Sequence, residues 1–180
     1  MKSLNSYITE GGFFKNVKAE LVTPENKKEL IKIINDTIEK EGPNCNLNFI
    51  DTSKITDMSA LFYSSKFNGD ISNWDVSGVK NMMSMFAYSK FDGDISNWDV
   101  SKVKNMGSMF YYSSFTGDIS KWNVSEVRDM HSMFSYSYFN GDISKWNVSN
   151  VKDMRNMFDG SKLEKLNKIP SWYKSIRMHK

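Results

Sequence analysis

Large apolar residues recur along most of this chain with a fixed step of 24 residues. The clearest markers are four tryptophans, Trp74, Trp98, Trp122 and Trp146, and the other strong positions keep the same spacing. One unit reads FxGDISxW(D/N)VSxVx(D/N)MxxMFxxSx, with a degenerate copy before the first of these four and a fading copy after the last. Self-similarity at this period is typical of a stacked repeat architecture.

Two periodicities alternate within one unit. Residues 79–86 place apolar side chains at i, i+3, i+6 and i+7, which favours a short helix with one apolar face. Trp74 and Val76 lie two residues apart between polar neighbours, which favours a short strand. A single unit has too few apolar side chains to fold alone, so neighbouring copies must share their apolar faces. We therefore expect an α/β, leucine-rich-repeat-like solenoid of about five strand-helix rungs.

The segments that flank the repeats are expected to cover the ends of the stack. Thr23 suits an N-cap, Pro24 suits the first helical position, and Gly42 suits a helix stop. Apolar residues between them fall on one stripe, which predicts a capping helix. The expected organisation is a flexible N-terminal extension (1–20), the capping helix (21–45), the repeat solenoid (46–163), and a C-terminal cap with a basic tail (164–180).

Composition and charge limit the kinds of partner that this chain is expected to bind. The chain is 39% hydrophobic and 14% aromatic, which is enough for a packed core. Its net charge of +3 arises in residues 161–180, where six basic residues face one acidic residue, whereas residues 43–160 hold eleven basic and thirteen acidic. A nucleic-acid-binding protein concentrates Lys and Arg on its folded body, so we expect no nucleic-acid partner. No run approaches the roughly 18 apolar residues of a membrane span.

The repeated string GDISxW(D/N)VSxVxxMxxMF, four times in register, resembles the BspA-type repeats. These form a leucine-rich-repeat-like family that is seen in many bacterial surface proteins and in some phage-encoded ones. The resemblance implies a solenoid with a binding or adhesion surface, and it brings no catalytic residues. Because the N-terminal segment lacks the apolar core of a secretory signal, we expect a phage-encoded or signal-less member that is cytoplasmic or virion-associated.

A second resemblance concerns residues 1–10, MKSLNSYITE. They look like the short N-terminal targeting segments of T-even-type phage head proteins, which are cleaved after Glu in a Leu/Ile-x-Glu site. Ile8, Thr9 and Glu10 match that site, which makes Glu10 a candidate processing site and Gly11 the new N-terminus. A flexible leader without processing is the alternative that these residues leave open.

The sequence gives little material for catalysis. An active site needs unlike groups brought together, whereas stacked copies line up like groups. His131 and His179 lack a partner at triad or metal-ligand spacing, and Cys45 is the single cysteine. We therefore expect no enzymatic activity, no cofactor and no metal site. One open alternative is Ca²⁺ binding by an aspartate column, although turn capping explains that column better. The column contains Asp70, Asp94, Asp118 and Asp142.

Positions that differ between copies are the candidate partner-binding sites. Tyrosines are frequent in protein interfaces because a large rigid ring ends in a polar tip, although these rings could instead pack over helix ends between copies. A second variable column is expected on the exposed strand face. The candidates are Tyr88, Tyr112, Tyr136 and Tyr138 among the tyrosines, and Asn73, Asn97, Lys121 and Lys145 on the strand face.

Together these patterns favour a non-enzymatic repeat module that binds a protein or glycan partner or serves as a scaffold. One alternative is a virion-associated or packaged phage protein with a cleavable N-terminal segment. Another is a calcium-dependent surface adhesin.

Overall fold

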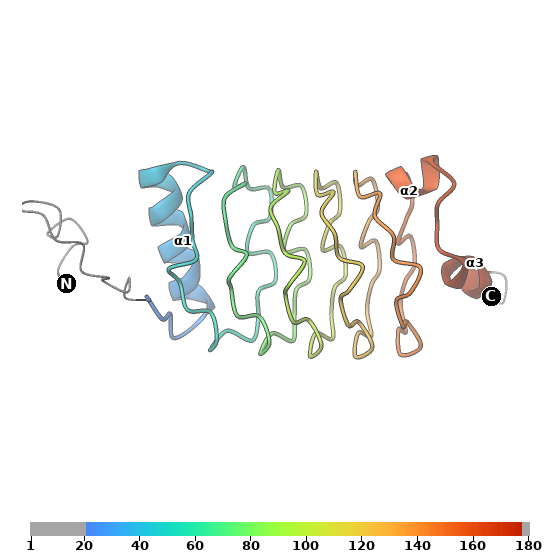
Figure 1. Cartoon of the computed structure of the whole chain (residues 1–180), viewed down its shortest axis with the longest axis horizontal. Helices are drawn as coiled ribbons and strands as arrows, with labels where there is room; N and C mark the ends of the chain where they lie inside the picture. The colour runs from blue at the N-terminus through green and yellow to red at the C-terminus, as the bar shows by residue number, and fades with distance from the viewer. Residues whose placement is uncertain (1–20, 178–180) are drawn as a thin grey trace, which may run out of the picture.

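The computed structural model describes residues 21–177, in which similar coils of chain are stacked between helices at the two ends (Figure 1). Helix α1 (Lys27–Glu41) precedes the repeats, and helices α2 (Lys162–Lys165) and α3 (Ser171–Arg177) follow them. None of these helices is long and apolar enough to cross a membrane. The expected N-terminal extension and the candidate processing site Glu10 lie outside the described residues.

The short helix expected in each copy is not formed, and turns take its place. Alternate N–H groups of residues 79–86 and their counterparts bond to the next copy: Ser84 N donates to Gly107 O and Phe86 N to Met109 O, each at 2.9 Å. A helix would need the same N–H groups for carbonyls four residues earlier. Ser84 also has a φ of 55°, in the left-handed region that a right-handed helix excludes. The apolar residues that suggested a helix are nevertheless buried, as Val79, Met82, Met85 and Phe86 show.

The strand expected around Trp74 and Val76 is also absent from the described residues. Parallel pairing occurs instead as isolated bridges between neighbouring copies. Each bridge between copies joins residues 24 apart, so the copies stack in register, and a further bridge joins Val22, which precedes α1, to Ile50. The series runs Asp57 to Asn81, Asn81 to Asn105, Asn105 to Asp129, and Asp129 to Asp153.

Two columns of buried phenylalanine rings run through the core. In the first, neighbouring centroids are 5.6 to 5.8 Å apart and the ring planes differ by 1 to 7°. In the second, the spacing is 6.1 to 6.3 Å. The glycine two residues after each ring of this second column lies against that ring. At Gly117, for example, an added Cβ would lie 2.8 Å from Phe115 Cε2. The columns contain Phe62, Phe86, Phe110, Phe134 and Phe158, and Phe67, Phe91, Phe115 and Phe139.

The tryptophans occupy equivalent environments, as the repeat predicts. Each indole N–H donates to a backbone carbonyl of the preceding copy, as in the 3.2 Å bond from Trp98 Nε1 to Ile71 O. The register would place the next tryptophan at position 170, which Pro170 occupies. Trp172 replaces it, because its Nε1 donates to Ile143 O at 3.1 Å. The C-terminal cap thus restores the contact after two additional residues.

Helix α1 covers the first coil, as the pattern predicts, but it begins later than expected (Figure 1). Asn26 is the N-cap, and its side chain accepts a hydrogen bond from Glu29 N at 3.1 Å. Assigning the cap to Thr23 was wrong, because the Thr23 hydroxyl instead donates to Asp51 Oδ2. The helix stops at Gly42 as expected, where φ is 89°. Leu30 and Ile34 are buried against the core.

Candidate functional site

Exposed tyrosines form a continuous ladder along the stack. Tyr88, Tyr112 and Tyr136 are 44%, 45% and 48% exposed, and their rings stack with centroids 5.3 and 4.5 Å apart. Tyr111 packs edge-on against all three. Tyr63 contacts Tyr88 edge-on at one end, and sequence reasoning missed it because it lies one position out of register. We call these five residues the tyrosine ladder.

The backbone beneath the ladder is unusual for tyrosine. Tyr88, Tyr112 and Tyr136 have φ values of 57, 51 and 55°, in the left-handed region that disfavours side chains with a Cβ. The equivalent positions in the first and last copies are Ser64 and Gly160, with φ values of 54 and 64°. Small residues therefore suffice to make this turn.

The stacking determines which part of each ring is presented. Tyr112 is covered on its two faces by Tyr88 and Tyr136. The other side of Tyr136 is occupied by Gly160, where an added Cβ would lie 2.6 Å from the Tyr136 ring. Burial raises the pKa of the Tyr111 hydroxyl, and the neighbouring Tyr88 contributes to this shift through a hydrogen bond. The ladder therefore presents ring edges and hydroxyl groups, whereas its ring faces are largely covered.

The column two residues beyond the ladder is exposed and basic. Four of its five members are exposed: Tyr138, at 66%, and the basic Lys66, Lys90 and Lys162, whereas Ser114 is half-buried. No ring contact is described for Tyr138, so it stands beside the ladder and is not part of it. The surface around the ladder thus combines hydroxyl groups with positive charge.

The second set of candidates lies in turns, so placing it on a strand face was wrong. Asn73, Asn97, Lys121 and Lys145 are all exposed. Asn97 and Lys121 border a shallow polar cavity of about 60 Å³ with Ser96 and Asp118. The described contacts join neither residue to the tyrosine ladder.

The aspartate column caps turns, as expected. The carboxylate of each member accepts the N–H of the serine two residues later at 2.9 Å. These hydrogen bonds hold the pKa of each carboxyl below its ordinary value. Within the described part of the chain, these carboxylates do not converge on a shared point.

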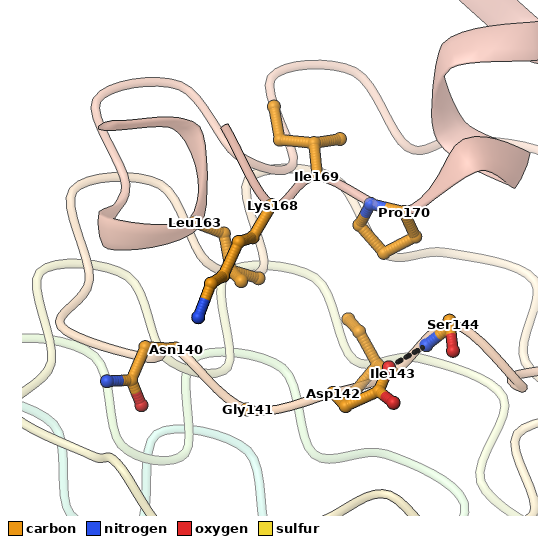
Figure 2. Close-up of a pocket in the computed structure, with 9 residues that line it drawn as sticks. All are labelled: Asn140, Gly141, Asp142, Ile143, Ser144, Leu163, Lys168, Ile169 and Pro170. Atoms are coloured by element: carbon orange, nitrogen blue, oxygen red, sulfur yellow. Dashed lines mark hydrogen bonds between the residues drawn. The ribbon is translucent and has the colours of Figure 1, made fainter. Parts of the chain in front are cut away.

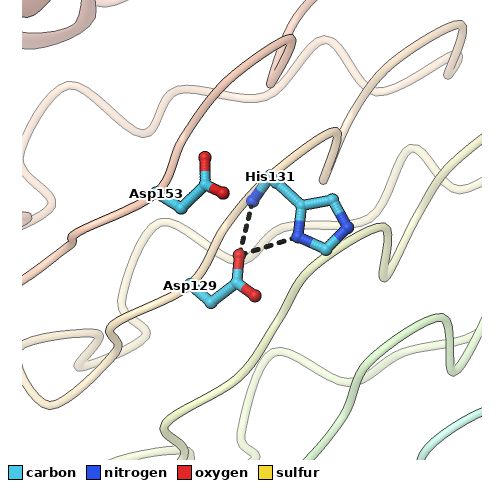
Figure 3. Close-up of side chains that lie close together, drawn as sticks. All are labelled: Asp129, His131 and Asp153. Atoms are coloured by element: carbon cyan, nitrogen blue, oxygen red, sulfur yellow. Dashed lines mark hydrogen bonds and ion pairs between the residues drawn. The ribbon is translucent and has the colours of Figure 1, made fainter.

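A different set of ligand-type side chains does converge, on two neighbouring copies. Asp129, His131 and Asp153 each place one ligand atom within 4.8 Å of the others, and all three are half-buried (Figure 3). His131 Nδ1 lies 2.8 Å from Asp129 Oδ1, and Arg155 pairs with Asp153 at 2.6 Å. The expectation that His131 lacks a partner was wrong: Asp129 of the same copy contacts its Nδ1, and Asp153 of the next copy completes the group.

Ser108, His131 and Asp129 follow one another in space in the order of a Ser-His-Asp catalytic triad. Its Oγ lies 3.4 Å from His131 Nε2, while Nδ1 faces Asp129. Two backbone N–H groups of this segment are already engaged: Ser108 N donates to His131 O, and Gly107 N donates to Asn105 Oδ1. An oxyanion would therefore find these two N–H groups occupied.

The larger of the two described cavities lies at the C-terminal cap. It measures about 360 Å³ and combines apolar Leu163, Ile169 and Pro170 with polar Asp142 and Lys168 (Figure 2). It lies where the chain departs from the repeat: Pro170 occupies the register position of the tryptophan, and Trp172, two residues later, makes the hydrogen bond to the preceding copy. It does not border the His131 group.

Comparison with known proteins identifies the family. The family described as "Mycoplasma protein of unknown function, DUF285" matches residues 32–137 and 111–177. The two matches overlap, as a repeated sequence allows, and together they run from α1 to the end of α3. No curated protein and no solved structure matches the chain. The chain therefore belongs to this repeat-containing family, Mycoplasma protein of unknown function, DUF285.

Proposed function

We propose that this chain is a non-enzymatic repeat module, a BspA-type solenoid related to leucine-rich repeats, that binds a protein partner through the tyrosine ladder. The observation that supports this proposal is the left-handed backbone of Tyr88, Tyr112 and Tyr136. A residue with a Cβ costs about 1–2 kcal/mol in that conformation, and glycine avoids this cost. Since Gly160 and Ser64 serve at equivalent positions, the turn itself does not require tyrosine.

The covered ring faces favour a protein over a glycan. Sugars bind aromatic residues mainly by stacking on an open ring face, whereas Tyr112 has neighbours on both faces. Hydroxyl groups and ring edges instead suit the carbonyls, carboxylates and apolar side chains of a protein surface. Lys90 and Lys162 in the adjacent column favour a partner with acidic groups.

Mutual stacking also prepares the ladder for binding. Each ring is held by its neighbours before a partner arrives, so little side-chain entropy remains to be lost on association. Tyrosine is among the residues that most often dominate the binding energy of an interface. A preorganised row of such rings is therefore a credible centre for a protein interface.

The test compares two triple variants that change different surfaces. The ladder variant is Y88S/Y112S/Y136S, with serine chosen because Ser64 has the same backbone conformation. The matched control is N97S/K121S/K145S, which changes the other candidate column. Both are first checked for wild-type circular dichroism and a cooperative melt. Partners captured by the wild type are then purified, and their affinities for all three proteins are measured.

We expect the ladder variant to lose at least tenfold in affinity for a directly binding partner, while the control keeps wild-type affinity. Equal affinity of the ladder variant and the wild type would overturn the proposal. Loss in the control alone would move the site to the Asn97 and Lys121 column. Binding to a glycan array that survives in the ladder variant would favour the glycan alternative.

A further inference from the structure

We infer that Asp129, His131 and Asp153 form a binding site for a divalent transition-metal ion such as Zn²⁺. One carboxylate oxygen from each aspartate and one imidazole nitrogen lie within 4.8 Å of one another (Figure 3). An imidazole with two carboxylates is a donor set that first-row transition ions accept. This inference is independent of the tyrosine ladder and of any protein partner.

The stack brings these ligands together because two adjacent copies both carry aspartate at the same column. Asp129 and Asp153 are joined by a parallel bridge, so their side chains emerge side by side. The earlier members of this column are Asp57 in the first copy and Asn81 and Asn105 in the next two. Each asparagine caps its turn as the aspartates do, for example through the 2.8 Å bond from Gly107 N to Asn105 Oδ1. Turn capping therefore does not explain the two negative charges.

A glycine in the preceding copy makes room for the imidazole. Gly107 occupies the column that holds Ser59, Met83, His131 and Arg155 in the other copies. A Cβ at Gly107 would lie 2.6 Å from His131 Nδ1 and 2.5 Å from Cε1, so the ring lies directly against this backbone. Its position keeps Nδ1 towards Asp129 and Nε2 towards Ser108. The ligand geometry is thus set by three consecutive copies.

Metal binding requires two exchanges at this site. The imidazole changes tautomer: the Nδ1 proton that faces Asp129 Oδ1 is lost while Nε2 takes one up, which frees the Nδ1 lone pair for the ion beside that carboxylate. The Arg155 guanidinium releases Asp153, which its 78% exposed side chain can do by turning into solvent. Water completes the coordination sphere. The imidazole ligand favours Zn²⁺ or Ni²⁺ over Ca²⁺ and Mg²⁺, which prefer oxygen donors alone.

The test uses isothermal titration calorimetry on the untagged full chain, with ZnCl₂ or CaCl₂ as the probe. All proteins carry H179Q, because His179 is the other imidazole of the sequence. We expect one Zn²⁺ per chain and at least tenfold weaker binding for H131Q and for D153N. Removing the competing guanidinium in R155Q should strengthen Zn²⁺ binding severalfold. Unchanged Zn²⁺ affinity in H131Q, or Ca²⁺ binding as tight as Zn²⁺ binding, would overturn the inference.

Two further measurements separate metal ligation from a merely structural role. S108A should bind Zn²⁺ as the parent does, because Ser108 contacts only the distal nitrogen of the ring. G107A should weaken Zn²⁺ binding at least fivefold, because the new methyl group displaces the imidazole. In long-range ¹H–¹⁵N spectra, Zn²⁺ should shift the Nδ1 resonance of His131. A His131 resonance that does not respond to Zn²⁺ would overturn the assignment even if a variant failed to fold.

Discussion

Replacing Tyr112 by alanine and by glycine measures the cost of the left-handed backbone under the ladder. Both changes remove the ring and its contacts with Tyr88 and Tyr136, so they differ only in the Cβ. At a φ of 51°, that Cβ costs about 1–2 kcal/mol. Glycine loses about 0.5–1 kcal/mol more backbone entropy than alanine on folding. We therefore expect Y112G to be more stable than Y112A by about 0.5–1 kcal/mol, which reverses the usual order.

Urea unfolding at 25 °C, followed by tryptophan fluorescence, measures this difference as a shift in the transition midpoint at constant m. Tyr138 provides the matched control, since it is 66% exposed and is not among the residues with positive φ. There we expect Y138A to be at least as stable as Y138G. If Y112A matches or exceeds Y112G while the control behaves as stated, the backbone does not disfavour tyrosine, and the main support for the proposed binding site is lost.

Two further predictions concern hydrogen bonds of the stack. Ser113 Oγ accepts the Phe115 N–H at 3.1 Å, whereas the buried Ser137 Oγ has no hydrogen-bond partner in the described structure. S113A should therefore lower the free energy of urea unfolding by about 1 kcal/mol, and S137A should leave it unchanged or raise it; equal losses would contradict this difference. The lowered pKa values of the aspartate column, relative to the ordinary 3.8, imply stability that is present at pH 7 and is lost as the pH falls below about 4. Changing the four residues to asparagine keeps the caps, so thermal melts between pH 6 and 2 should show a flatter profile than the wild type, and an unchanged acid profile would count against this assignment. The four are Asp70, Asp94, Asp118 and Asp142.

The burial pattern was predictable from the sequence, but the local backbone was not. Residues 79–86 carry the spacing of a helix, and their apolar members are buried as that spacing requires. The same spacing also fits successive turns whose N–H groups bond to the next copy, as the Ser84 N to Gly107 O bond shows. The apolar spacing within residues 79–86 says nothing of these acceptors, because the acceptor carbonyls belong to the next copy. Stacking therefore decides the backbone where local preference alone favours a helix.

The ends of α1 show the same limit on a smaller scale. The stop at Gly42 depends on a local property, the ease with which glycine adopts a positive φ, and the sequence predicts it. The start depends on competition between two good caps, Thr23 and Asn26. Thr23 is engaged by Asp51, which lies 28 residues away, and this leaves Asn26 to cap the helix. Only the tertiary contact distinguishes the two.

The candidate metal site could have been found by comparing columns instead of neighbours along the chain. A search for ligand spacing finds only Asp129 beside His131, because Asp153 is 24 residues away from Asp129. In a stack, however, residues one period apart in the sequence lie on neighbouring copies and are therefore close in space. Aligning the copies places the two aspartates together, with the histidine two residues after the first. The tyrosine ladder was found in this way, because its three main members share one column.

Differences between adjacent copies shape both candidate sites of this stack. Identical columns repeat one chemical group, and charged members of such a column repel one another. In the aspartate column, the charges of Asp70 and Asp118 raise the pKa of Asp94, but the hydrogen bonds from Ser96 lower it more strongly. Such a column serves the turns, but it does not create a new combination of groups. A glycine before His131, by contrast, gives the imidazole its place, and Gly160 after Tyr136 gives the last ring its place. The repeated positions therefore build the stack, and changes between adjacent copies, such as Gly107 before His131 and Gly160 after Tyr136, complete its two candidate sites.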